Sequence, residues 1–103
     1  MIIVGAGPAG IFAALELVRH DGLSVALVER GPDISRRACP ARTTGVCNSC
    51  EPCDITCGWG GAGAFSDGKL TLTTEVGGWL DKFVPKERLR ELIEYVDGIW
   101  LEY

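Results

Sequence analysis

Four cysteines near the middle of the 103-residue chain have the spacing of a metal-binding run. They are Cys47, Cys50, Cys53 and Cys57, which spell C-x₂-C-x₂-C-x₃-C, with Cys39 further upstream. Bacterial iron–sulfur proteins use this run, with a proline where this chain has Gly58. Zinc also accepts four thiolates in a closed tetrahedral site. The spacing therefore predicts a metal centre and leaves iron–sulfur and zinc open, against the alternative of free thiols that pack as small apolar residues.

A second group of residues near the start of the chain has the pattern of a phosphate-binding turn. The segment Gly5-Ala6-Gly7-Pro8-Ala9-Gly10 fits G-x-G-x-x-G. In dinucleotide-binding proteins the first glycine permits a tight turn, the second lets the backbone approach a pyrophosphate, and the third lets a helix pack on a strand. An acid about 20 residues later accepts hydrogen bonds from a ribose hydroxyl, and Glu29 lies 19 positions after Gly10. The candidate ligands are Gly5, Gly7, Pro8, Ala9, Gly10 and Glu29, and Arg30 is either a neighbour of the adenosine end or a solvated charge.

The elements that must position these residues can be read around them. Residues 1–4 are an apolar run that predicts a strand, residues 11–18 predict a helix with Pro8 near its first turn, and residues 24–28 predict a second parallel strand. Gly22 is the expected left-handed cap between helix and strand. In the alternative interpretation the glycines serve only a tight turn. Strand, turn, helix, strand and acid together favour an α/β, Rossmann-like βαβ unit that binds a dinucleotide.

A second glycine-rich stretch runs from Gly58 to Leu70. Within it, Gly63 to Lys69 spells G-x-x-x-x-G-K, but an ATP-binding loop needs Ser or Thr after the lysine and must lead into a helix. This chain has Leu70 there, and residues 70–74 alternate as in a strand. Because dense glycine indicates close approach of backbone to another group, we expect Gly61 and Gly63 to form a second wall of the dinucleotide site.

These segments together resemble the N-terminal part of the flavoproteins known as NAD(FAD)-utilizing dehydrogenases, which have a glutathione-reductase-like FAD domain. The resemblance rests on residues 5–10, on Glu29-Arg30-Gly31, and on the cysteine-rich stretch that runs into residues 58–70, and it covers nearly the whole chain. It implies FAD bound at Gly5, Gly7, Gly10 and Glu29, with the second glycine stretch near the flavin or the pyrophosphate. It also implies several hundred further residues, which complete the FAD domain and supply a substrate domain.

The expected function is therefore that of an FAD-dependent oxidoreductase whose substrate is unassigned. NAD(P) is an alternative ligand or a co-substrate, because the same fingerprint and acid serve both cofactors. The rival function is an electron-transfer or metal-binding module in which the cysteine run is the functional centre and the βαβ unit is a scaffold.

Composition limits the partners. The chain has 10 basic and 14 acidic residues, a net charge of −4, and no basic run longer than Arg36-Arg37, which argues against nucleic acid. No apolar run approaches the ~18 residues of a membrane span. We expect a cytoplasmic protein whose partners are a small-molecule substrate or electron carrier and the remainder of the same polypeptide.

The predicted organisation is the N-terminal part of a single FAD-binding domain over residues 1–103. It comprises the βαβ fingerprint at 1–30, a Cys/Gly-rich insertion at 33–69 and an amphipathic helix at 85–103. The fold is expected to be incomplete, because only two strands clearly fit the parallel sheet. One face of the C-terminal helix carries apolar residues at helical spacing, namely Leu89, Leu92, Ile93, Val96, Ile99, Trp100 and Tyr103.

Overall fold

The computed structural model describes residues 1–102 and divides the chain into two compact units. The first unit covers Met1–Asp67 and the second covers Gly68–Tyr103. The last residue of the predicted C-terminal helix, Tyr103, lies outside the described residues. The assignment of both units to a single FAD-binding domain stays a prediction.

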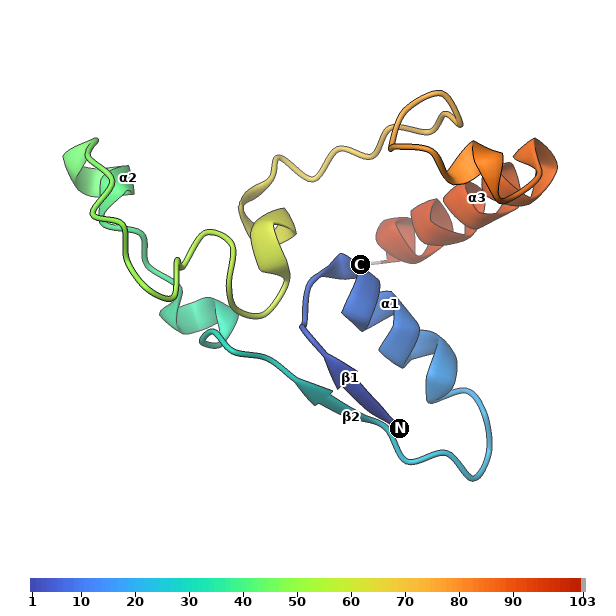
Figure 1. The fold of residues 1–103 in the computed structure, drawn as a ribbon, viewed down its shortest axis with the longest axis horizontal. Helices are drawn as coiled ribbons and strands as arrows, with labels where there is room; N and C mark the ends of the chain where they lie inside the picture. Colours follow the sequence, from blue (N-terminus) through green and yellow to red (C-terminus); the bar gives the residue numbers. More distant parts are fainter. Residues whose placement is uncertain (103) are drawn as a thin grey trace. The chain divides into compact units, whose positions relative to one another are not determined.

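The first unit contains the predicted βαβ arrangement (Figure 1). Strand β1 covers Ile2–Val4, helix α1 covers Pro8–Leu17, and strand β2 covers Ala26–Val28. The strands are parallel, with Ile2 opposite Ala26, Ile3 opposite Leu27 and Val4 opposite Val28. Helix α1 begins at Pro8, whose missing N–H would have no intrahelical partner in any case. This confirms the small parallel sheet and its crossover helix, with strands shorter than predicted.

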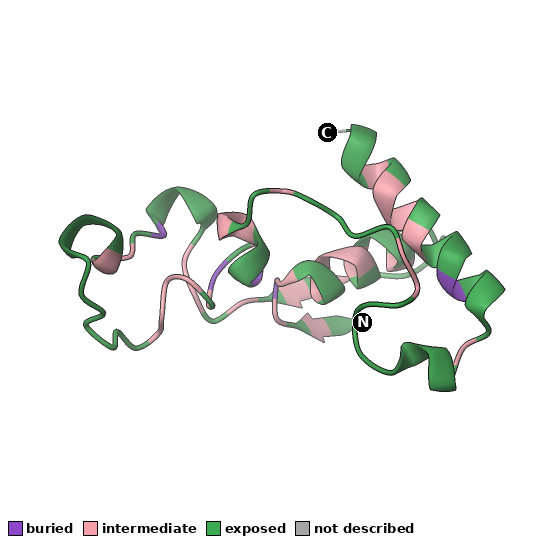
Figure 2. Cartoon of the chain, turned by 90° about the horizontal axis from the view of Figure 1, so that it is seen from above, coloured by how far each residue is buried: buried purple, intermediate pink, exposed green. Residues whose placement is uncertain are grey.

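Burial alternates along both strands of the sheet, as the colours of Figure 2 show. The central residues Ile3 and Leu27 are half-buried. Their neighbours point to the other face and are exposed: Ile2 by 73%, Val4 by 85% and Val28 by 54%. Parallel sheets are normally covered on both faces. The first unit therefore carries an apolar sheet face that the rest of this unit leaves open.

Two glycines explain the turns of the βαβ unit. Gly22 has the predicted left-handed conformation, with φ = 82°, but it lies in the turn before β2. It is not the helix cap that was predicted, because the C-cap of α1 is Val18 in a right-handed conformation. Gly10 is required by packing, because a Cβ there would overlap the carbonyl oxygen of Gly5 and lie 3.4 Å from Cγ2 of Ile3. The third glycine of the fingerprint therefore lets α1 approach the end of β1, as predicted.

The segment after β2 has little regular structure, in agreement with its lack of sequence period. It contains a 3₁₀ helix η1 at Ile34–Arg36, a single helical turn α2 at Ala41–Thr44, and a 3₁₀ helix η2 at Gly61–Phe65. The carboxylate of Asp33 caps η1 by accepting a hydrogen bond from the Ser35 N–H at 3.0 Å. Gly45 ends α2 with φ = 75°.

The second unit consists of a 3₁₀ helix η3 at Leu80–Lys82 and helix α3 at Lys86–Glu102. Leu89 is buried, and Ile93, Val96 and Ile99 are half-buried, so most of the predicted apolar face packs inward. Leu92 and Trp100 from the same set are exposed. Trp100 is nevertheless tied down, because its indole N–H donates to the carbonyl of Gly68 at 3.0 Å.

The predicted strand at residues 70–74 is wrong. These residues form an irregular segment and a turn, and the only strand pair within residues 1–102 is β1 with β2. Alternation of Leu and Thr describes a residue pattern, but a strand also needs a partner for its backbone groups. None of the described helices is long and apolar enough to cross a membrane.

Candidate dinucleotide site

The fingerprint turn leaves an open position at its middle glycine. Gly5 has φ = 99°, and its N–H donates to the carbonyl of Val28 at 2.7 Å, so the turn starts directly from the sheet. Gly7 is the N-cap of α1 with φ = −75° and ψ = 177°, angles that any residue adopts. A Cβ built at Gly7 meets no atom within 4 Å. The protein therefore needs glycine at positions 5 and 10 for its own geometry, whereas the space beside Gly7 is free for a ligand.

The first turn of α1 faces the same loop with free donors. The N–H of Ile11 donates to the carbonyl of Gly7 at 3.0 Å, which is the first bond of the helix. The amides of Ala9 and Gly10 precede that bond and have no partner among residues 1–102. Unpaired amides and the positive end of the helix dipole attract an anion such as a pyrophosphate.

The acid at the end of β2 is held by main-chain donors. Oε2 of Glu29 accepts from the N–H of Ala6 at 2.7 Å, and Oε1 accepts from the N–H of Gly31 at 2.9 Å and of Gly58 at 2.8 Å. These bonds, led by the one from Ala6, lower the pKa of Glu29 to about 2 from its usual 4.5, because they favour the charged form. Glu29 is therefore an oriented carboxylate, and each oxygen has a limited number of acceptor positions. Oε2 accepts one of the three short bonds and Oε1 accepts two, and the main-chain N–H of Arg30 also helps to lower the pKa of Glu29.

Ala6 connects three segments that are far apart in the sequence. It is completely buried. Its N–H donates to Glu29, and its carbonyl accepts from the N–H of Gly60 at 2.8 Å. The acid and the second glycine stretch are thereby bonded to the same residue of the fingerprint turn.

The second glycine stretch packs on the fingerprint turn. A Cβ built at Gly61, which has φ = 56°, would lie 3.1 Å from Cα of Gly7. One built at Gly63 would lie 3.4 Å from Cγ of Pro8. The structure therefore brings Gly61 and Gly63 beside the first two residues of the loop-to-helix junction.

Arg30 lies on the outside of this arrangement. Its guanidinium forms an ion pair with Glu51 at 3.2 Å, and both side chains are largely exposed. Exposed pairs of this kind contribute little to stability. The placement resembles the solvated alternative more than a contact with the turn.

Sequence reasoning missed two contributors to this site. The first is the N–H of Gly58, since a main-chain donor leaves no mark in a residue pattern. The second is Arg37, which is only 7% exposed and donates to three main-chain carbonyls. In the sequence Arg37 was part of the basic pair Arg36-Arg37, and no signal separated the two residues.

The structure does not bring the four cysteines together. Cys47 and Cys50 are exposed, and Cys53 and Cys57 are half-buried free thiols. Cys53 and Cys57 share one turn, in which the Cys57 N–H donates to the carbonyl of Cys53 at 2.8 Å. Within residues 1–102, no three His, Cys, Asp or Glu side chains are grouped so that they could hold a metal ion. The predicted ligand set therefore does not form a metal site in this conformation.

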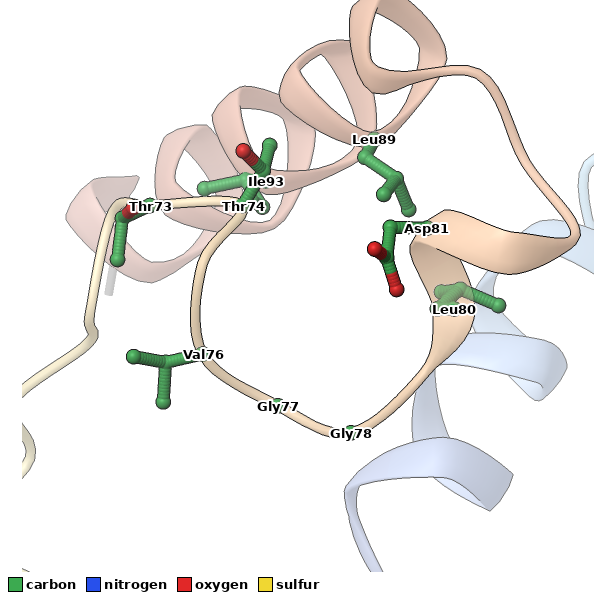
Figure 3. A pocket seen from close by; sticks show the side chains of 9 residues that line it. All are labelled: Thr73, Thr74, Val76, Gly77, Gly78, Leu80, Asp81, Leu89 and Ile93. Carbon is green, nitrogen blue, oxygen red and sulfur yellow. The ribbon is translucent and has the colours of Figure 1, made fainter.

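The second unit has a small pocket of its own, with a volume of about 120 Å³. Figure 3 shows it between α3, which contributes Leu89 and Ile93, and the loop that carries Gly77 and Gly78. Asp81 is the one charged side chain in its lining. A single carboxylate among apolar groups and threonines defines no chemistry, so we assign this pocket no role.

The fold and the glycine turn are those of a dinucleotide-binding protein, and a comparison with protein families gives the family. The profile of the FAD dependent oxidoreductase family matches residues 1–94, and the chain belongs to this family. This confirms the predicted family, whose cofactor is FAD, and the small parallel sheet with its crossover helix is consistent with the Rossmann-like fold of that family. The iron–sulfur, zinc and NAD(P) predictions stay predictions.

Two relatives are similar over part of the chain. An "Uncharacterized protein" of Clostridium beijerinckii is 47% identical over 73 residues, which are 68% of this chain and 13% of that protein. A protein of Archaeoglobus profundus that is described as similar to a heterodisulfide reductase component is 39% identical over 56 residues, which are 54% of this chain and 8% of that protein. The chain thus spans a small part of the length of these relatives. No solved structure matches it significantly.

Proposed function

We propose that the protein containing this chain is an oxidoreductase and that the first unit binds the adenosine and pyrophosphate part of FAD. The flavin, when bound, supplies hydride or electron transfer, while the protein supplies position and electrostatics. The proposal assigns Gly5, Gly7, Pro8, Ala9, Gly10 and Glu29 to binding.

The observation that carries the proposal is the free space beside Gly7. Glycine weakens a folded chain through its entropy unless the backbone needs it. At Gly7 neither the backbone angles nor the packing requires glycine. A ligand that approaches the main chain closely would require it, and the unpaired amides of Ala9 and Gly10 indicate that this ligand is an anion.

Glu29 and the second glycine stretch complete the proposed binding site for the adenosine and pyrophosphate part of FAD. The ionised carboxylate of Glu29 is the proposed acceptor for a ribose hydroxyl through Oε2, which accepts fewer main-chain bonds than Oε1, and this role fits the adenosine half of FAD. Gly61 and Gly63 lie beside Gly7 and Pro8 without side chains that would fill the space. Arg30 remains a candidate contact with the adenosine end only if it leaves Glu51.

A pair of glycine substitutions tests the assignment. Gly7→Val in the intact protein places a side chain where the pyrophosphate is proposed to lie, and we expect it to abolish copurification of FAD. Gly98→Val in α3 is the matched control, because a Cβ there also meets no atom within 4 Å. Flavin absorbance per polypeptide is the measurement. Stoichiometric FAD at wild-type affinity in Gly7→Val would show that the assignment is wrong.

The remaining predictions belong to the whole protein. We propose a small-molecule substrate or an electron carrier as its partner, a cytoplasmic location, and NAD(P) as a co-substrate. Calorimetric titration of the FAD-loaded protein with NAD⁺ and NADP⁺ tests the last of these.

The four cysteines support a second candidate function, metal binding. Their spacing favours it, and the exposure of Cys47 and Cys50 leaves them free to move toward the turn of Cys53 and Cys57. Metal binding can supply the free energy that orders such a segment. Because the thiols do not converge in this structure, we derive no electron-transfer step through them.

A further inference from the structure

We propose that Arg37 is a positioning residue for FAD binding, and this inference rests on the function proposed above. Its guanidinium fixes the segment of residues 54–60, so that two peptide groups of this segment meet Glu29 and the fingerprint turn. Arg37 itself is not assigned a contact with the cofactor.

The guanidinium of Arg37 is saturated by main-chain acceptors. Nε donates to the carbonyl of Asp54 at 2.9 Å, Nη2 to that of Ile55 at 2.8 Å, and Nη1 to that of Trp59 at 2.7 Å. Cζ of Arg37 lies 4.7 Å from the centre of the Phe65 ring. This cation–π contact fixes the plane of the guanidinium. Arg37 is 7% exposed. A buried cation with this geometry holds both ends of the segment from residue 54 to residue 59.

One peptide unit transmits this constraint to the fingerprint. The carbonyl of Trp59 and the N–H of Gly60 belong to the same planar unit. Arg37 holds the carbonyl, and the N–H donates to the carbonyl of Ala6 at 2.8 Å. Any rotation of this unit would break both bonds, so Arg37 determines the direction of the Gly60 N–H.

A second contact transmits the constraint to the acid. Gly58 lies against Arg37, because a Cβ built at Gly58 would come within 2.8 Å of Cδ of Arg37. The N–H of Gly58 donates to Oε1 of Glu29 at 2.8 Å. Arg37 therefore supports the donor that helps to hold Glu29 in place, although it lies 8 positions from Glu29 and 21 positions from Gly58 in the sequence.

Lysine cannot replace this arrangement. Its ammonium is a compact point charge on a flexible stem, whereas the guanidinium presents donors in a rigid planar fork. An ammonium at position 37 keeps the charge but cannot reach three carbonyls on two sides of the loop. Arg37→Lys therefore keeps the positive charge and removes the planar set of donors, so it tests the geometry of the guanidinium and not its charge.

The experiment compares Arg37→Lys with Arg36→Lys in the intact protein. Arg36 is the neighbouring arginine and is exposed, so the same substitution there is a matched control. FAD is removed, and its dissociation constant is measured by titration between pH 7 and pH 4, beside the thermal unfolding midpoint of the flavin-free protein. We expect Arg37→Lys to weaken FAD binding by about tenfold or more at pH 7, since it loses hydrogen bonds to a charged group, and Arg36→Lys to bind as the wild type does.

The pH profile separates positioning from general stability. The main-chain N–H groups of Ala6, Gly31 and Gly58, in this order, lower the pKa of Glu29, and burial opposes them, so loss of the Gly58 N–H raises this pKa in part. FAD binding to Arg37→Lys should therefore fall more steeply toward pH 4 than binding to the wild type. If that variant does not fold, Arg37→Gln, which retains one amide donor, takes its place with the same expectation.

The outcomes are distinct. Absence of FAD binding in both the wild type and Arg36→Lys would show that the proposed function is wrong. Binding in both of these together with wild-type affinity in Arg37→Lys would overturn only the positioning role. A loss that equals the unfolded fraction, with the pH profile of the wild type, would overturn that role as well.

Discussion

The N–H of Ala6 donates to Oε2 of Glu29 at 2.7 Å, across 23 residues of sequence. The glycine turn and the acid are thus bonded to each other directly, in addition to any ligand that they share. The same carboxylate also accepts from Gly31 and Gly58. Glu29 therefore supports the fold of the turn, in addition to its proposed role as the acceptor for a ribose hydroxyl.

A first prediction concerns the pH dependence of stability. The pKa of Glu29 is lowered in the folded protein to about 2 from 4.5. A lowered pKa contributes stability that is fully present above pH 4.5 and is lost as pH falls toward 2. We expect Glu29→Gln to be less stable than the wild type at pH 7, and the difference to shrink between pH 4.5 and pH 2. Urea unfolding of the flavin-free protein across this range measures it.

The control for that experiment is Glu16→Gln. Glu16 forms an exposed ion pair with Arg19 within α1 at 2.8 Å, and such pairs contribute little. Its variant should stay close to the wild type at every pH. A Glu29→Gln difference that is constant from pH 7 to pH 2 would contradict the assigned ionisation.

A second prediction concerns the helix–strand junction. Gly10→Ala introduces a methyl group against the carbonyl oxygen of Gly5, so we expect a loss of folded protein or a markedly lower unfolding midpoint. Gly98→Ala lies in open space within α3 and should be neutral or stabilising by up to about 1 kcal/mol, because alanine is the better helix former. Thermal unfolding followed by circular dichroism compares them. Equal midpoints for the two variants would refute the packing role of Gly10.

A third prediction concerns residues 1–103 as an isolated polypeptide. Its sheet exposes the apolar residues Ile2, Val4 and Val28 on one face, so binding of FAD must also offset the cost of ordering the chain. We expect weak binding or none. Calorimetric titration with FAD checks this, and a dissociation constant tighter than about 1 μM would be inconsistent with it.

A fourth prediction concerns the cysteine run. If Cys47, Cys50, Cys53 and Cys57 hold one centre, anaerobically purified intact protein should contain iron and sulfide, or zinc, and Cys47→Ser should lose most of it. Cys39→Ser is the matched control, since Cys39 lies outside the compact run and should retain the metal. Elemental and sulfide analysis decides this. The prediction is wrong if the folded, flavin-loaded protein contains none of these elements and has four titratable thiols.

The sequence was sufficient to predict the elements whose causes are local. The apolar runs of β1 and β2, the glycine turn and the position of Pro8 led to the βαβ unit, and the spacing of Leu89, Ile93 and Val96 led to α3. The boundaries were less accurate: β2 begins at Ala26 rather than Ser24, and α3 begins at Lys86 rather than Pro85. Each of these differences concerns one or two residues at the end of a strand or helix, where backbone hydrogen bonds decide which residue is counted as the first.

Features that depend on distant partners could not be predicted. Residues 70–74 have a strand pattern but no strand beside them among residues 1–102. The bonds that hold Glu29 come from main-chain groups, and the role of Arg37 depends on carbonyls 17 to 22 residues away. The contact of Gly61 with Gly7 joins residues that no local period relates.

The two bonds of Ala6 also imply an order of events during synthesis. A nascent chain can close the bond from Ala6 to Glu29 once the second strand has left the ribosome, 23 residues later. The bond from Gly60 has to wait until more than 50 residues have followed Ala6. The proposed wall of Gly61 and Gly63 is therefore placed only after Glu29 has joined the turn, and the proposed binding of FAD by these residues begins only after translation has passed them.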